Sequence, residues 1–506
     1  MGDITGFLKY SRQTATRRPV EIRKKDYREV YNDMGDKELS IQGARCMDCG
    51  IPFCHDGCPL GNLIPEFNDF VYKNEWENAF DRLHATNNFP DFTGRLCPAP
   101  CEGACVLGIN SDPVAIKQIE LSIVEHKAKV SKFEPVISEI KTGKKVAIVG
   151  SGPSGLAAAQ QLVRAGHEVT VYERGEKPGG LLRYGIPEFK MEKSVLDRRL
   201  DQLIAEGVNF ECSTFVTDKM GSLTSGVPNN SPAQNCKYIP LSDIKKTYDA
   251  VLLTVGSTVA RDLNIKGRNL KGIHFAMDYL KESNLFCEGS KDELTISAKD
   301  KDVIIIGGGD TGADCLGTAI RQEAKSIFQL EIMPEPPLNR PTDNPWPTWP
   351  LILRTSSAHE EGGERLFSVT ATEFVSTDGI NLSGIMITEV RQSLSDQRTV
   401  FENVLGTEKL LKTDLVLLAM GFVGPELNHY EDALDPTDNI RGNFKVDSDW
   451  RTKDDNIFAA GDAVRGQSLI VWAIAEGRSA AYSVDRYLMG YSNLPIPLKP
   501  YQYALR

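Results

Sequence analysis

A glycine-rich turn that occurs twice, each time between an apolar run and a helical stretch, constrains the fold of this 506-residue chain most strongly. The first copy, GSGPSG at 150–155, follows KKVAIV and precedes LAAAQQLVRAG and HEVTVYER. The second copy, GGGDTG at 307–312, follows DVIII and leads into a helical stretch and the run SIFQL. A strand, a glycine turn, a helix and a second strand make a βαβ unit. The sequence therefore predicts an α/β fold with two nucleotide-binding domains, whose motif glycines are Gly150, Gly152, Gly155, Gly307, Gly309 and Gly312.

The first glycine turn has the residues that a dinucleotide site needs. Gly150 allows the tight turn, Gly152 lets a pyrophosphate approach the backbone, and Gly155 lets the helix pack on the strand. Glu173 ends the next strand, 18 residues after Gly155, where a carboxylate accepts hydrogen bonds from a ribose. A purely structural glycine turn is the alternative. The complete strand, turn, helix and strand context favours dinucleotide binding.

The second glycine turn differs from the first in the residues that would meet the ribose. Asp310 and Thr311 begin its helix. The strand that follows ends in Gln329, Leu330 and Glu331, with no arginine or lysine. A carboxylate at that point suits a free 2′-hydroxyl and repels a 2′-phosphate. We therefore expect this second dinucleotide to be NADH in preference to NADPH.

A third phosphate-binding turn is expected near the C-terminus. Gly461 and Asp462 follow a short apolar strand and precede a helix in NIFAAGDAVRGQSLIVWAIAEGRSAA. A helix N-terminus offers unpaired N–H groups and partial positive charge to a phosphate or to an electron-rich flavin ring. Asp462 would hold a ribityl or pyrophosphate group, and an ordinary acidic helix cap is the alternative.

Seven of the eleven cysteines fall between residues 46 and 105. CMDCGIPFCHDGC gives C-x2-C-x4-C-x3-C, followed by Pro59, and CPAPCEGAC gives C-x3-C-x3-C. Such runs are typical of iron–sulfur ligands, and their fourth cysteine ligates a second cluster. Structural zinc is the alternative, although it normally shows two C-x2-C knuckles and only one is present. For His55, inside the run, a supporting or exposed role is favoured over ligation. The seven cysteines are Cys46, Cys49, Cys54, Cys58, Cys97, Cys101 and Cys105.

Composition excludes several classes of protein. With 58 basic and 69 acidic residues the net charge is −11, which opposes a nucleic-acid binder because such proteins need concentrated positive charge. No N-terminal segment has the apolar core of a signal peptide, and no uncharged run reaches the ~18 residues of a membrane helix. We therefore expect a cytoplasmic protein with no membrane association. In that compartment clustered thiols are more often metal ligands than disulfides.

Five other segments give further predictions. Residues 1–30 are locally basic and are interpreted as a solvated tail or as a docking arm for an acidic partner. Apolar residues at three- and four-residue spacing over 63–80 predict a helical stretch within a small helical metal domain at 35–130. The polar stretch 220–243 is expected to be an exposed loop. The apolar runs at 250–257 and 415–422 are expected to be strands where the chain crosses between the two nucleotide-binding domains.

Together these residues resemble the small (β) subunit family of glutamate synthase and the related N-terminal half of dihydropyrimidine dehydrogenase. The resemblance covers nearly the whole chain, and its most specific parts are GGLLRYGIPEFKM and the double cysteine pattern. It implies an N-terminal α-helical iron–sulfur domain followed by two Rossmann-like domains of the glutathione and adrenodoxin reductase type. The expected domains are 1–140 (helical, iron–sulfur), 141–285 (FAD, first part), 286–425 (NAD(P)H) and 426–506 (FAD, second part).

The resemblance also implies which residues hold the cofactors. Two 4Fe-4S clusters would be present, the first on Cys46, Cys49, Cys54 and Cys105, the second on Cys58, Cys97 and Cys101. The eighth ligand would follow the segment PVAIKQIE, which points to Glu120, and a surface glutamate on a helix is the alternative. The stretch 343–363 looks like the members that use NADH. Further FAD or NAD(P)H contacts would be Pro153, Ser154, Arg174, Gly180, Leu181, Leu182, Lys190 (a phosphate partner), Val216, Gly256, Gly421, Ser468 and Leu469.

The function implied is an oxidoreductase that takes a hydride from NAD(P)H at FAD and passes single electrons through the clusters. The acceptor would be the large (α) glutamine-hydrolysing subunit that makes L-glutamate from 2-oxoglutarate, in a hetero-oligomer. Hydride transfer needs stacking geometry and a dry site, so we expect no catalytic side chain. Three alternatives stay open: a related enzyme with another acceptor, a zinc-stabilised flavoprotein scaffold, and a diaphorase whose clusters are structural.

Overall fold

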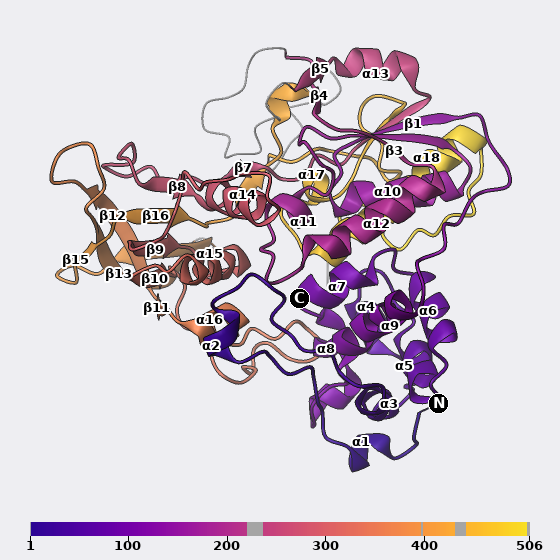
Figure 1. Ribbon diagram of the computed structural model, residues 1–506, viewed down its shortest axis with the longest axis horizontal. Coiled ribbons are helices and arrows are strands. Elements are labelled where there is room, and N and C mark those ends of the chain that lie inside the picture. The colour runs from indigo at the N-terminus through magenta and orange to yellow at the C-terminus, as the bar shows by residue number, and fades with distance from the viewer. Residues whose placement is uncertain (1, 220–235, 396–397, 431–441, 503–506) are drawn as a thin grey trace.

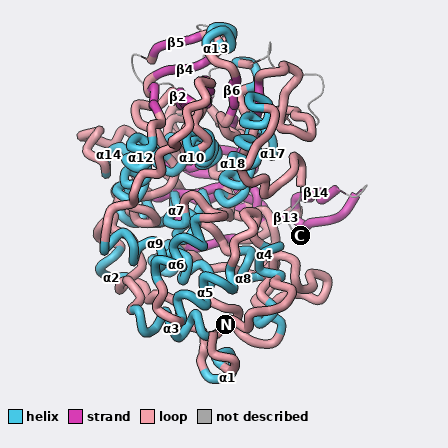
Figure 2. The backbone as a smooth tube through the Cα atoms, turned by 90° about the vertical axis from the view of Figure 1, so that its right-hand side faces the viewer, coloured by secondary structure: helices cyan, strands magenta, loops and turns pink. Residues whose placement is uncertain are grey.

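The computed structural model describes residues 2–219, 236–395, 398–430 and 442–502. These residues form a helical body at the N-terminus and two α/β bodies, each built on its own parallel sheet (Figures 1 and 2). In Figure 1 the helical body lies below the first sheet, and the second sheet lies to the left. The predicted fold class is confirmed.

Short helices make up most of the helical body, and three of them have a proline in the first or second position, which is pre-set for the first turn and needs no N–H partner there. The helical stretch expected over 63–80 is two helices, because the chain turns at Asn74, where φ is +59°. Ile64, Phe67 and Val71 form the buried face of the first of these. The elements are α1 (Gly6–Lys9), α2 (Val20–Arg23), α3 (Asp36–Ala44), α4 (Phe53–Gly57), α5 (Ile64–Tyr72), α6 (Trp76–His84), α7 (Pro90–Leu96), α8 (Pro100–Gly103), η1 (Val106–Ile109) and α9 (Ile116–Val130).

The first α/β unit has a five-stranded parallel sheet in the order β18-β6-β1-β2-β3. Strands β1, β6 and β18 are buried apolar runs, as expected where helices cover both faces of a sheet. The last strand of the chain, β18, pairs with β6, so a segment near the C-terminus completes a sheet that begins some three hundred residues earlier. The elements are β1 (Lys145–Val149), α10 (Pro153–Arg164), β2 (Glu168–Tyr172), α12 (Lys193–Glu206), β3 (Asn209–Glu211), β6 (Ala250–Leu253), β18 (Ile457–Ala459) and α18 (Ile470–Met489).

The second α/β unit repeats this plan with the strand order β11-β10-β9-β16-β8. Its edge strand β8 and the helix α14 both precede residue 288, so the division expected at 285/286 falls inside α14. The second sheet therefore begins earlier in the chain than expected. The elements are β8 (Ile273–Phe275), α14 (Ala276–Cys287), β9 (Asp302–Ile306), α15 (Asp310–Arg321), β10 (Ser326–Leu330), α16 (Ser357–Glu361), β11 (Glu364–Leu366) and β16 (Leu415–Leu418).

The chain crosses between the two units after β6 and after β16, as expected. The two crossing segments, β7 (Val259–Ala260) and β17 (Phe422–Gly424), pair with each other as an antiparallel ribbon. An antiparallel group that the sequence analysis did not predict extends the second unit between β11 and β16. Its strands are β12 (Val369–Val375), β13 (Gly384–Ser395), β14 (Arg398–Asn403) and β15 (Lys409–Lys412).

The polar stretch 220–243 is only partly described. Its residues 220–235 lie outside the described residues, so the expected loop is untested there. The remainder is regular structure: β5 (Lys237–Ile239) pairs with β4 (Thr214–Val216), and α13 (Leu241–Thr247) follows. The loop prediction is therefore wrong for 237–239 and 241–243, where buried Leu241 fixes the helix.

Part of the basic N-terminal segment is buried against the rest of the chain. Arg23 is 1% exposed, and its Nε donates to Glu361 Oε1 at 2.7 Å. Arg321 donates to the other oxygen of the same carboxylate at 2.6 Å, so Glu361 is shared by two buried guanidinium groups. Figure 1 shows α2 beside α16. The tail interpretation is wrong for this part, because the segment docks on the second α/β unit of its own chain.

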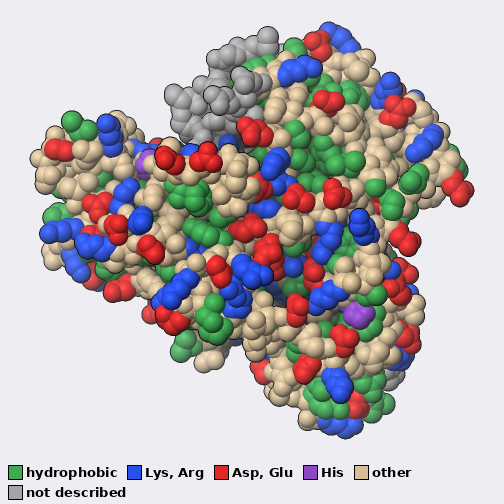
Figure 3. Space-filling model, in the orientation of Figure 1, with side chains coloured by type: hydrophobic (Ala, Val, Ile, Leu, Met, Phe, Trp, Pro, Cys, Tyr) green, Lys and Arg blue, Asp and Glu red, His purple; other side chains and the backbone are tan. Residues whose placement is uncertain are grey.

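Charged side chains of both signs are interspersed over the face shown in Figure 3. Among the helices that the structure describes, none is both long and apolar enough to cross a membrane.

Candidate cofactor sites

A cavity of about 350 Å³ lies at the carboxyl ends of the first sheet's strands, within the range of about 300–1,000 Å³ usual for ligand pockets. All three bodies contribute to its wall, since Leu96 and Pro98 come from the helical body and Asp314 from the second unit. The predicted site residues that line it are Gly150, Gly152, Pro153, Ser154, Glu173, Arg174, Gly180, Leu181, Leu182, Val216, Gly256, Asp310, Thr311, Asp462, Ser468 and Leu469. Those that do not are Gly155, Lys190, Gly307, Gly309, Gly312, Glu331, Gly421 and Gly461.

The first glycine turn has the close contacts that its sequence predicts. Gly150 has φ +103°, and a Cβ on it would lie 2.5 Å from the Thr254 carbonyl oxygen. A Cβ on Gly155 would overlap the Gly150 carbonyl oxygen, so the helix packs on the turn only without a side chain. A Cβ on Gly152 would meet nothing within 4 Å, and no side chain caps α10 there. The open side of this turn therefore suits an anionic group.

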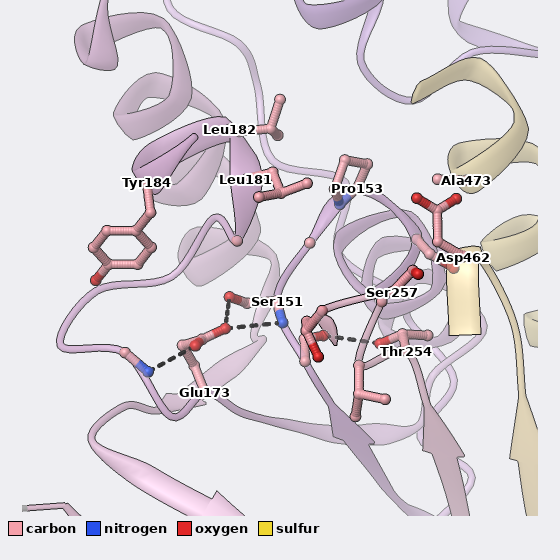
Figure 4. Close-up of a pocket in the computed structure, with 18 of the residues that line it drawn as sticks. Ser151, Pro153, Glu173, Leu181, Leu182, Tyr184, Thr254, Ser257, Asp462 and Ala473 are labelled. Atoms are coloured by element: carbon pink, nitrogen blue, oxygen red, sulfur yellow. Dashed lines mark hydrogen bonds between the residues drawn. The ribbon is translucent and has the colours of Figure 1, made fainter. Parts of the chain in front are cut away.

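Glu173 is fixed at the rim of this turn before any ligand is present. One carboxylate oxygen accepts from the Ser151 hydroxyl and from the Ser151 N–H at 3.2 Å (Figure 4). The other accepts from the Gly175 N–H at 2.7 Å. The predicted ribose acceptor is thus held beside the glycine turn.

Two buried hydroxyl groups in the cavity wall lack a hydrogen-bond partner among the described residues. They are Ser154 Oγ, in the first turn of α10, and Ser257 Oγ, in the turn after β6. Because buried hydroxyl groups are normally paired, these two atoms indicate a polar ligand in the cavity. An FAD molecule, with phosphate and ribityl oxygens, fits this donor set.

Asp462 lies near Pro153, at the start of α10 (Figure 4), and a Cβ on the preceding Gly461 would lie 2.9 Å from the Ser154 Cβ. It accepts a hydrogen bond of 2.6 Å from the Ser468 hydroxyl, and burial raises its pKa to about 6. Behind it, Glu476 accepts from the Gly461 N–H at 2.9 Å and pairs with Arg465. The C-terminal turn therefore presents a carboxylate whose supports are buried.

Lys190, predicted to bind a phosphate, does not line the cavity. Its ammonium group is paired with the Asp314 carboxylate, which lines the cavity from the second unit. The pair raises the pKa of Lys190 although burial opposes this, so the ammonium stays charged. The phosphate role stays a prediction, and in this structure the pair joins the two units.

The second glycine turn repeats the first in outline. Gly307 has φ +126°, and a Cβ on Gly312 would overlap the Gly307 carbonyl oxygen. A Cβ on Gly309 would again meet nothing. The Glu331 carboxylate lies over Gly308, so closely that a side chain at 308 would overlap it, and accepts from the Met333 N–H at 2.9 Å. The predicted ribose acceptor and the turn are thus brought together.

The seven cysteines of the helical body fall into two groups. Cys46, Cys49, Cys54 and Cys105 line a small cavity of about 20 Å³. The second group consists of Cys58, Cys97, Cys101 and Glu120. Besides burial, the charges of Cys58 and Glu120 raise the pKa of Cys97, and the charges of Cys58, Cys97 and Glu120 raise the pKa of Cys101. This division brings together the two sets that the resemblance implies. Among the described residues no three such side chains have the geometry of a single-ion site.

The chemistry of these thiols fits a metal cluster. Burial raises the pKa of Cys46 and Cys58 to about 11 and that of Cys97 to about 12. A buried thiol with such a pKa stays protonated unless a bound cation compensates its negative charge, as iron does when it binds thiolates.

Glu120 is a buried residue of α9, which contradicts the alternative of a surface glutamate. It is 6% exposed, and its Oε1 accepts from Asn87 Nδ2 at 2.6 Å and from the Thr93 hydroxyl. Burial raises its pKa to about 7. A carboxyl group held in this way next to three cysteines is a reasonable eighth ligand.

Sequence reasoning missed several cavity residues outside the glycine motifs. Thr254 donates to the Gly150 carbonyl oxygen at 2.9 Å, and Ser257 is one of the unpaired hydroxyl groups. Glu426 pairs with Arg174 at 2.9 Å. The run TVGS after the strand at 250–253 was a signal for the first two, because polar residues after a parallel strand meet at the ligand edge. Glu426 had no local signal.

Two family descriptions match this chain. Residues 144–477 match the family described as pyridine nucleotide-disulphide oxidoreductase. Residues 23–132 match the family described as dihydropyrimidine dehydrogenase domain II, 4Fe-4S cluster. The protein named glutamate synthase [NADPH] small chain of Mycobacterium tuberculosis is 54% identical over 99% of both chains.

The chain belongs to the glutamate synthase small-chain family. A second family member, from Bacillus subtilis, is 43% identical over 98% of this chain and 100% of its own length. In Saccharomyces cerevisiae the protein named glutamate synthase [NADH] is 44% identical over 97% of this chain, which corresponds to 22% of that protein.

The two α/β units of this family member have a fold also seen in solved structures. FprA of Mycobacterium tuberculosis, solved in complex with NADPH, aligns with a TM-score of 0.51 at 17% identity over 70% of this chain and 88% of its own. This likeness concerns the fold alone.

Proposed function

We propose that this chain is an NAD(P)H-dependent flavoprotein that passes electrons from FAD through two 4Fe-4S clusters to a large glutamate synthase subunit. The observation that carries the proposal is the position of Cys97, whose two neighbours, Leu96 and Pro98, form part of the cavity wall. A cluster on Cys97 would therefore lie next to a flavin in the cavity. FAD, when bound, would accept one hydride, which carries two electrons, and would release those electrons one at a time.

The chain's own residues bind and orient the cofactors. Gly152 and the start of α10 offer the pyrophosphate an open backbone turn, and Glu173 accepts from the ribose. Apolar Leu181 and Leu182 line the cavity. We assign one cluster to Cys46, Cys49, Cys54 and Cys105, and the other to Cys58, Cys97, Cys101 and Glu120.

Of the two nicotinamide dinucleotides, we propose NADH as the preferred donor. The Glu331 carboxylate over Gly308 favours a free 2′-hydroxyl. Relatives carry both names, NADPH in Mycobacterium tuberculosis and NADH in Saccharomyces cerevisiae, so the names give no decision. NADPH-dependent dye reduction equal to or faster than NADH-dependent reduction would overturn this preference.

For the partner, the yeast relative is informative because the matching segment makes up only 22% of that one protein. We propose that a separate large subunit supplies the remainder here and that the two form a hetero-oligomer in the cytoplasm.

The deciding experiment is anaerobic purification with the native partner, followed by assay of iron, acid-labile sulfide and glutamine-dependent NAD(P)H oxidation. Eight iron atoms per chain follow from two clusters. Protein without iron, or flavin that stays oxidised when NAD(P)H is added, would overturn the proposal. Zinc in place of iron would favour a zinc-stabilised flavoprotein scaffold. A different co-purifying acceptor would favour a related oxidoreductase with another acceptor. Partner-coupled turnover that survives Cys97→Ala would favour the diaphorase.

A further inference from the structure

The carbonyl oxygen of the first motif glycine accepts a side-chain hydrogen bond in both α/β units, but the donors differ. In the first unit Thr254 Oγ1 donates to the Gly150 oxygen at 2.9 Å. In the second unit Gln329 Nε2 donates to the Gly307 oxygen at 2.8 Å. Thr254 follows β6, whereas Gln329 lies in β10, so the donors come from opposite neighbours of the central strand.

The backbone identifies the residue of the second unit that corresponds to Thr254. The Thr254 N–H donates to Val149 and the Ala419 N–H donates to Ile306, both at 2.8 Å. Val149 and Ile306 are the last residues of β1 and β9, so Ala419 occupies the threonine's position. Its methyl group has no hydrogen to donate, and the bond to the turn has to come from elsewhere.

His359 determines which end of the Gln329 amide faces the turn. The Ser356 N–H donates to His359 Nδ1 at 3.3 Å, which leaves the hydrogen on Nε2. Nε2 then donates to Gln329 Oε1 at 2.8 Å. With its oxygen engaged in this way, the amide turns its NH₂ group toward Gly307. Burial, and then the charges of Arg365 and Lys190, lower the pKa of His359 to about 4, so the ring is neutral at pH 7.

The amide also sets the space around the turn. Gln329 is 1% exposed, so water does not compete for the Gly307 oxygen. A Cβ on Gly312 would overlap Gln329 Nε2, which places the amide against the first turn of α15. The Gly307 carbonyl and the Gly308 N–H belong to one planar peptide group. Fixing the carbonyl therefore fixes Gly308 beneath the Glu331 carboxylate.

We propose that Gln329 and His359 are positioning residues of the second unit, which hold its glycine turn in the shape that binds the dinucleotide. This inference rests on the proposed function of that unit. The pair replaces, from the other side of the turn, the hydroxyl that Ala419 lacks. Neither residue needs to touch the dinucleotide, because both act through Gly307.

The first test compares Gln329→Ala with a matched buried glutamine of the same unit. Gln322 accepts from the Tyr279 hydroxyl at 3.0 Å and from the Ala298 N–H at 2.9 Å, at the far end of α15. We expect Gln329→Ala, and more weakly His359→Asn, to raise the Kd for NAD⁺ about tenfold in the FAD-loaded holoenzyme. Gln322→Ala should lower the melting temperature and leave that Kd unchanged.

The second test restores the hydrogen bond to Gly307 from position 419, which corresponds to Thr254 of the first unit. Gln329→Ala combined with Ala419→Thr should regain most of the NAD⁺ affinity, because the new hydroxyl enters the space that the amide vacates. Gln329→Ala combined with Ala419→Val supplies the same side-chain shape without a hydrogen-bond donor, and it should not regain the NAD⁺ affinity. Should Gln329→Ala fail to fold, Gln329→Glu keeps the side-chain size but loses the donor, and it should weaken NAD⁺ binding in the same way.

Three results would overturn the inference. They are a folded Gln329→Ala protein with unchanged NAD⁺ affinity, equal rescue by threonine and valine, and unchanged affinity in Gln329→Glu. A wild-type holoenzyme that binds neither NAD⁺ nor NADP⁺ would be a different failure, because it would overturn the proposed function of the unit and this inference with it.

Discussion

In the first α/β unit the carboxylate after the second strand is surrounded by donors, and in the second unit it is more open. Glu173 accepts from the Ser151 N–H and hydroxyl and from the Gly175 N–H. Among the described contacts, Glu331 accepts from the Met333 N–H, and the residue beneath it is a glycine. The order of four strands (β6-β1-β2-β3 and β16-β9-β10-β11), the glycine spacing and the overlap of the third glycine with the first carbonyl are nevertheless the same.

This difference shows how one backbone plan serves two kinds of ligand. A carboxylate held by several donors is already in its binding position, so little order is lost when a ligand arrives and the ligand is held tightly. A carboxylate with fewer fixed donors adjusts as its ligand enters and leaves. On the proposed function, the first unit retains FAD through many turnovers while the second exchanges its dinucleotide.

The most severe test of the comparison removes each turn separately. Gly155→Ala and Gly312→Ala both force a Cβ into the first glycine's carbonyl oxygen. We expect Gly155→Ala to purify without FAD and without NAD(P)H oxidation. Gly312→Ala should keep its yellow FAD and lose reduction by NAD(P)H. Flavin absorbance before and after anaerobic addition of NADH measures both. Loss of FAD from the Gly312→Ala protein would break the division of labour.

A milder test concerns retention by the first unit. Glu173→Gln keeps the shape of the side chain but turns one acceptor oxygen into a donor that faces the Ser151 or Gly175 N–H. We expect FAD to dissociate about tenfold faster. Dilution followed by flavin fluorescence measures the rate, with the corresponding substitution Glu331→Gln as control. Equal FAD loss from the two variants would contradict the comparison.

The corresponding change in the second unit should alter selectivity rather than retention. Glu331→Gln removes the negative charge that repels a 2′-phosphate. We expect the ratio of kcat/KM for NADH over kcat/KM for NADPH to fall about fivefold, because the hydrogen bond from the ribose to Glu331 would then be made to a neutral amide in place of a charged carboxylate. Dye-reduction kinetics with both donors measures the ratio. An unchanged ratio would mean that a residue other than Glu331 discriminates between the 2′-hydroxyl and the 2′-phosphate.

The smallest expected effect is a pH dependence of FAD retention. Burial raises the pKa of Asp462 to about 6, so its carboxyl group is ionised at pH 7.5 and protonated at pH 5. The ionised form accepts hydrogen bonds from an FAD hydroxyl more strongly than the protonated form, in which one of the two oxygens carries a hydrogen. FAD release should therefore accelerate a few-fold as the pH falls through about 6. In Asp462→Asn the release rate should be nearly independent of pH over that range. The same acceleration in the variant would assign the effect to another group.

Much of the fold followed from local patterns. The apolar runs before Gly150 and Gly307 are strands β1 and β9, because short β-branched runs followed by glycine turns and helices leave few other structures. The division of the seven cysteines into two ligand sets was implied by the resemblance and stays a prediction. The antiparallel strands β12 to β15 were not predicted, and the division at 285/286 was placed after β8, since a three-residue strand has no periodicity to detect.

The candidate sites show the same limit. The family resemblance implied Glu120 as a ligand candidate, yet only the structure shows that it is buried beside Asn87 and Thr93. The sequence also gave no sign that Arg23 would be buried against Glu361, more than three hundred positions later. Such pairings depend on how the three bodies pack, which no local pattern records.

The sequence by itself determined the two glycine turns and the order of helical and α/β segments, because steric rules on neighbouring residues are enough to impose them. Only the tertiary structure decided that β18 completes the first sheet, that the two neighbours of Cys97 form part of the cavity wall, and that Gln329 replaces the hydroxyl absent at Ala419. Those outcomes are long-range contacts, and their energies depend on burial and complementarity between segments that are distant in the chain.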